Sequence, residues 1–113
     1  MSQQLQTSNN EPPKSPSAQF DIKNILENSI LGKDILKKYR ASNSLDNGDQ
    51  TTIVRLIVEH CAFTNIKMDP KIMSTAAEEI TKIFPTENVS TYYVPRSNKR
   101  NPSGKIYDRY FNM

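Results

Sequence analysis

The sequence has few of the residues that enzymes and metal proteins use. Its 113 residues include one cysteine, one histidine, three glycines and no tryptophan. A single cysteine excludes a disulfide within the chain and fits a reducing compartment. His60 and Cys61 fall short of the three or four ligands that zinc requires, and the three glycines are too dispersed for a phosphate-binding loop. We therefore expect no catalytic residue, no metal and no cofactor, and we predict that the protein is not an enzyme.

Long hydrophobic runs are missing as well. No apolar stretch approaches the roughly 18 residues that a membrane-spanning helix needs. The N-terminus lacks the charged segment and apolar segment of a signal peptide. We expect a soluble intracellular protein with no membrane contact.

The first part of the chain is poor in apolar residues. Residues 1–19 contain one large aliphatic side chain, Leu5, among Gln, Ser, Asn and Pro. So little apolar surface does not offset the entropy lost on ordering. The sequence therefore predicts a disordered leader over residues 1–19 and a small helical domain over residues 20–113.

Beyond the leader, apolar residues recur at spacings of three and four, which is the period of an amphipathic helix. Asp21 is the expected N-cap of a first helix, and Gly32 is expected to end it. Asp34 is the expected N-cap of a second short helix, whose outer face is rich in lysine.

Two longer helices follow. The third, from about Asp49 to Thr64, is apolar over more than half of its circumference, which predicts a central, buried helix. The fourth has Asp69 as N-cap and Pro70 as its first residue, and Pro85 ends it. This pair has the proportions of a helix-turn-helix. The fourth helix carries as many acids as bases, however, so two packed core helices are the favoured interpretation.

The C-terminal quarter is more irregular. Thr91–Val94 is β-branched and aromatic, which favours a short extended segment. Residues 98–104 form a turn-rich loop, and residues 106–111 have helical spacing. Together the patterns predict an all-α protein, a compact bundle of four to five short helices with a disordered N-terminal leader and a basic C-terminal loop.

Positive charge and tyrosine gather in this last quarter. The formal net charge of the chain is +3, yet five cations against Asp108 place a net +4 in residues 96–113. Cations bind phosphates by releasing counterions, and exposed tyrosines stack on unpaired bases. The candidate nucleic-acid-binding residues are Arg96, Lys99, Arg100, Lys105, Arg109, Tyr92, Tyr93 and Tyr107. We predict a nuclear or nucleocytoplasmic protein that binds DNA or RNA with this loop.

Two alternatives remain open. The tyrosines of this region complete the hydrophobic core in the first, and the charged loop is then only solvated. In the second, the protein is a protein-interaction or self-association module in a regulatory complex, which pairs with a protein partner or forms a homodimer through the third and fourth helices.

Several short strings of the sequence resemble a known set of proteins. Two of them, Phe-Pro-Thr-Glu at 84–87 and Pro-Ser-Gly-Lys-Ile-Tyr at 102–107, are specific as a pair. Three further segments, at 30–36, 53–58 and 91–95, carry the same resemblance. Residues 20–112 thereby resemble a loosely defined family of insect proteins, mostly uncharacterised and often present in many transposon-associated copies. The resemblance implies a recurring domain connected with DNA or chromatin, without catalytic residues or an established ligand.

Overall fold

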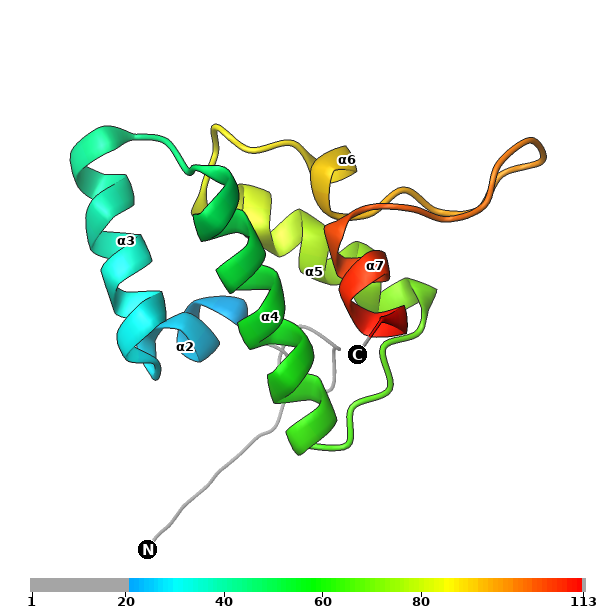
Figure 1. Ribbon diagram of the computed structural model, residues 1–113, viewed down its shortest axis with the longest axis horizontal. Coiled ribbons are helices and arrows are strands. Elements are labelled where there is room, and N and C mark those ends of the chain that lie inside the picture. The colour runs from blue at the N-terminus through cyan, green and yellow to red at the C-terminus, as the bar shows by residue number, and fades with distance from the viewer. Residues whose placement is uncertain (1–20, 113) are drawn as a thin grey trace, which may run out of the picture.

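Six helices form the framework of residues 21–112, the part of the chain that the computed structural model describes. They are α2 (Ile22–Glu27), α3 (Ile30–Ser42), α4 (Asn47–Phe63), α5 (Pro70–Ile83), α6 (Val89–Tyr92) and α7 (Lys105–Phe111), shown in Figure 1. The all-α prediction is therefore confirmed, with one helix more than the sequence patterns indicate. The predicted disordered leader, residues 1–19, lies outside the described residues.

The boundary between α2 and α3 differs from the predicted one. Asp21 caps α2 as expected, accepting a hydrogen bond from the Asn24 backbone N–H at 3.2 Å. Ser29, however, is the N-cap of α3, and its hydroxyl accepts from the Gly32 N–H at 3.2 Å. Gly32 thus lies inside α3 rather than ending a helix, and Asp34 caps nothing. Both predictions were wrong because Gly32 serves a close approach to α2, where a Cβ would lie 2.2 Å from the Leu26 carbonyl oxygen.

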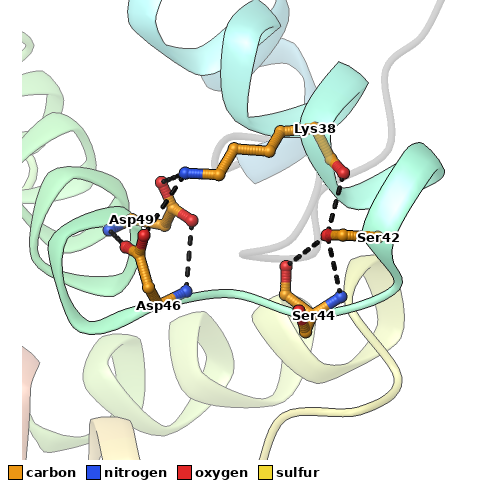
Figure 2. A network of polar contacts seen from close by, with 5 residues as sticks. All are labelled: Lys38, Ser42, Ser44, Asp46 and Asp49. Atoms are coloured by element: carbon orange, nitrogen blue, oxygen red, sulfur yellow. Dashed lines mark hydrogen bonds and ion pairs between the residues drawn. The ribbon is translucent and has the colours of Figure 1, made fainter.

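A polar network fixes the turn between α3 and α4 (Figure 2). The Asp46 side chain accepts from the Asp49 N–H at 2.7 Å, and the Asp49 side chain accepts from the Asp46 N–H at 3.1 Å, which is a capping box. The Lys38 ammonium lies 3.1 Å from Asp49 and 3.3 Å from Asp46. The hydrogen bond to Asp49, followed by the one to Asp46, raises the pKa of Lys38. The pKa of Asp46 is lowered mainly by the hydrogen bond from the Asp49 backbone N–H, and secondly by the hydrogen bond from Lys38. Helix α4 consequently begins at Asn47, two residues before the predicted start.

Helix α4 is the central element, as its apolar circumference predicts. It buries Ile53, Val54, Ile57, Val58 and Cys61. Its closest helical neighbours are α7, α2 and α3. Burial raises the pKa of the Cys61 thiol to about 11, so this side chain is a protonated core residue rather than a nucleophile.

Helix α5 follows its sequence signals closely. The Asp69 side chain accepts from the Ile72 N–H at 2.9 Å, and Pro70 is the first helical residue. The closest neighbours of α5 are α6, α2 and α7. Helices α4 and α5 make little direct contact with each other, so they do not form the paired unit of a helix-turn-helix, and both pack against α2 and α7.

The segment between α5 and α6 is held by a buried aromatic contact and by partly buried hydrogen bonds. Phe84 is fully buried and meets Tyr39 edge to face, with ring centroids 4.9 Å apart. The Tyr39 hydroxyl bonds to the Thr86 hydroxyl at 2.8 Å and accepts from the Thr86 N–H at 3.1 Å. Glu87 accepts from Gln50 at 2.9 Å and from the Tyr92 hydroxyl. The Phe-Pro-Thr-Glu string therefore has a structural role, which is to hold the segment after α5 against the helical body.

Candidate nucleic-acid interface

A two-stranded arm, residues 94–103, projects from the helical body between α6 and α7 (Figure 1). Val94 and Ser103 exchange backbone hydrogen bonds of 2.8 and 3.0 Å. Ser97 and Arg100 exchange bonds of 3.1 and 3.4 Å around a two-residue tip. The turn-rich loop predicted for residues 98–104 is thus one half of an antiparallel hairpin. The sequence carries no clear hairpin signal, since the tip of the arm is Asn-Lys rather than Asn-Gly.

The arm starts and ends at buried residues. Tyr93 precedes it, and Ile106 follows three residues after Ser103, the last bridged residue; both side chains are in the core. Gly104 closes its base with φ at +111°, where a Cβ would lie 2.5 Å from the Tyr92 carbonyl oxygen. Only glycine accommodates both this dihedral angle and this approach. The Pro-Ser-Gly-Lys-Ile-Tyr string therefore marks the point where the arm rejoins the body.

The arm presents three cations without a compensating acid. Arg96, Lys99 and Arg100 are exposed, and residues 94–103 contain neither Asp nor Glu. None of the three takes part in an ion pair among residues 21–112. The Arg96 guanidinium donates across the hairpin to the Asn101 side-chain oxygen at 3.3 Å. Their positive charge is therefore available to a ligand.

The other two predicted cations lie on α7, against α4. Lys105 donates to the Asn47 side-chain oxygen at 2.9 Å. Arg109 lies 3.6 Å from Glu59, which also pairs with Arg55 at 3.9 Å. The structure thus brings three of the five predicted cations together and engages the remaining two in holding α7 to α4.

Two of the three tyrosines predicted to stack on bases are buried, and the third is half-buried. Tyr92 is 0% exposed and Tyr93 is 3% exposed, so neither ring offers a face to a base. Burial, with the bond to Glu87, raises the pKa of Tyr92. Tyr107 is half-buried and lies against Phe111, with centroids 4.6 Å apart. For Tyr92 and Tyr93 the alternative holds: these rings complete the core.

The described residues show neither a metal centre nor a membrane span. Within residues 21–112, no three His, Cys, Asp or Glu side chains are grouped so that they would hold a metal ion. Over the same range, no helix has the length and apolarity needed to cross a bilayer. The comparisons with protein-family models, curated proteins and solved structures give no match to this chain.

Proposed function

We propose that the arm, residues 94–103, binds the phosphate backbone of duplex DNA. One observation carries the proposal: a hairpin that projects from the body and holds three exposed cations with no carboxylate among its residues. Lysine and arginine gain free energy at DNA by displacing condensed counterions. A projecting arm brings these charges to a phosphate backbone without requiring the body to approach.

Burial of Tyr92 and Tyr93 favours a duplex over a single strand. Single-strand binding without sequence preference relies on aromatic rings on which bases stack, and these two rings are in the core. A two-stranded ribbon, in contrast, fits the major groove of B-DNA, which is about 12 Å wide. The corresponding groove of duplex RNA is too narrow to enter. DNA is therefore the ligand that suits the arm best.

The residue types on one part of the arm also suit base edges. Arginine pairs with guanine and asparagine with adenine in the major groove, and Arg96 and Asn101 lie next to each other across the hairpin. Duplex DNA as ligand implies a nuclear or nucleocytoplasmic location, which agrees with the location expected from the sequence.

Changing Lys99 and Arg100 to Ala tests this function. Each phosphate contact contributes about −0.9 to the slope of log K against log salt, so the double variant is expected to lower the magnitude of this slope by about 1.8. Fluorescence anisotropy with a labelled duplex, at several salt concentrations, measures both affinity and slope. The matched control is Lys67→Ala with Lys71→Ala, two exposed cations outside residues 94–103. Unchanged affinity in the arm variant, or equal loss in the control, contradicts the proposal.

Self-association is the second candidate, and one observation favours it. The apolar stripes of α4 and α5 are packed in the core of this chain, but Phe63 at the end of α4 is 90% exposed. A second copy or a protein partner that covered this ring would remove its apolar surface from water. Sedimentation of wild type and Phe63→Ser over a range of concentrations tests it. A wild-type monomer at all concentrations removes the homodimer and leaves only other partners.

A further inference from the structure

A second concentration of positive charge lies in a groove away from the arm. The groove runs between α2, α3 and the end of α5, and its volume is about 330 Å³. Its floor includes the buried rings of Tyr39 and Phe84. Three cations line it, one from each helix: Lys23, Arg40 and Lys82.

The charged side chains that line this groove are all cations. No carboxylate lines it. Lys82 pairs with Glu79 at 3.3 Å, whereas Lys23 and Arg40 form no ion pair among residues 21–112. The larger groove between α3 and α4, of about 730 Å³, is by comparison lined by three carboxylates. Phosphate chemistry therefore suits the smaller groove and not the larger one.

The groove and the arm are far apart. The described domain extends 56 Å along its longest axis. Helix α3, which carries Arg40, lies at one end of that axis, and the arm projects at the other (Figure 1). A duplex on the tip of the arm lies beyond that end of the molecule, so the groove is left open to a different segment.

We propose that the groove of Lys23, Arg40 and Lys82 is a second phosphate-binding site, and that one molecule joins two duplex DNA segments. This inference rests on the function proposed for the arm. The arm holds one segment, and the groove holds the phosphate backbone of another. The contact in the groove is electrostatic and independent of base sequence, because contacts to phosphate oxygens carry no sequence information directly.

A bead-capture experiment tests the second site. A biotinylated duplex of about 20 base pairs is immobilised, and a second, fluorescent duplex is retained only if the protein holds both. Such duplexes are far shorter than the DNA persistence length of about 150 base pairs, so one duplex cannot bend round to occupy both sites. Wild type is expected to retain the second duplex in low salt. Lys23→Gln with Arg40→Gln is expected to lower this retention at least about fivefold, while its anisotropy affinity for a single duplex stays within about threefold.

The controls separate the two proposals. Lys67→Gln with Lys71→Gln removes the same charge elsewhere, and it should retain the second duplex as wild type does. Retention by the Lys23/Arg40 variant at the wild-type level overturns the inference and points to a dimer that bridges with two arms. No retention by wild type, although arm-dependent binding of one duplex persists, overturns the inference and leaves the function of the arm standing. Failure of wild type to bind any duplex overturns both.

Discussion

Gly104 shows how a single residue controls the base of the arm. Its φ of +111° and its contact with the Tyr92 backbone leave no room for a side chain. Gly104 and the hydrogen bonds of residues 84–87 give a structural explanation for the two conspicuous strings of the sequence, at 84–87 and 102–107. Phe84, Thr86 and Glu87 are engaged with Tyr39, Gln50 and Tyr92 inside the domain. At these positions the residue type is set by packing.

Replacing Gly104 by Ala is expected to destabilise the domain. The backbone conformation alone costs a residue with a side chain about 1–3 kcal/mol, and the overlap with Tyr92 adds to this. Urea denaturation followed by circular dichroism measures the change in unfolding free energy. Gly48→Ala is the control, because Gly48 is exposed in the first turn of α4 and its nearest neighbour to an added Cβ is Asp46, at 3.3 Å. Alanine favours a helix over glycine by about 1 kcal/mol, so the control should be neutral or more stable. Equal losses in both variants would refute the role of Gly104.

At the scale of elements, local signals predicted some helices well and others poorly. Helix α5 agrees with its sequence at both ends because Asp69, Pro70 and Pro85 act on the backbone directly. The predicted extended segment at 91–94 was right only in its second half: Thr91 and Tyr92 belong to the short helix α6 (Val89–Tyr92), whereas Tyr93 is extended and Val94 pairs with Ser103. The β-branched and aromatic residues of α6 favour strands, but the burial of Tyr92 and its bond to Glu87 favour the helical turn. A tertiary contact overrides a local preference in so short a segment.

The start of α3 offers a direct test at this scale. Ser29→Ala removes the observed N-cap and should lower the unfolding free energy by about 1 kcal/mol. Asp34→Ala removes the cap predicted from the sequence, and it should change stability by less than about 0.5 kcal/mol, since Asp34 is exposed in the interior of α3. Urea denaturation of both variants under the same conditions decides between them. A larger loss for Asp34→Ala would mean that α3 begins where the sequence pattern placed it.

At the scale of the whole molecule, the arm and the body are expected to be separable. Arm residues 95–101 are all exposed, Pro102 is half-buried, and none of them belongs to the core. The buried residues Tyr93 and Ile106 lie on either side of it. The body therefore keeps its core when the arm is shortened.

Replacing residues 95–102 by Asn-Gly tests this separation. The two strand ends at Val94 and Ser103 are already paired, and Asn-Gly forms a two-residue hairpin turn. The unfolding free energy is expected to change by less than about 1 kcal/mol, while binding of duplex DNA is lost. Thermal melting and fluorescence anisotropy measure the two effects. A large loss of stability would show that the arm is part of the fold, and retained binding would place the DNA contact elsewhere.

The sequence by itself determined the helical class, the bounds of α5, the central place of α4 and the gathering of positive charge near the end of the described chain. Capping residues, prolines and apolar spacing act between neighbours along the chain, so they can be read without a structure. Only the tertiary structure decided which charges are available. It pairs Arg109 with Glu59 and buries Tyr92 and Tyr93, whereas Arg96, Lys99 and Arg100 project on a hairpin. It also gathers Lys23, Arg40 and Lys82 in one groove. These outcomes depend on contacts between segments distant in sequence, which local patterns do not encode.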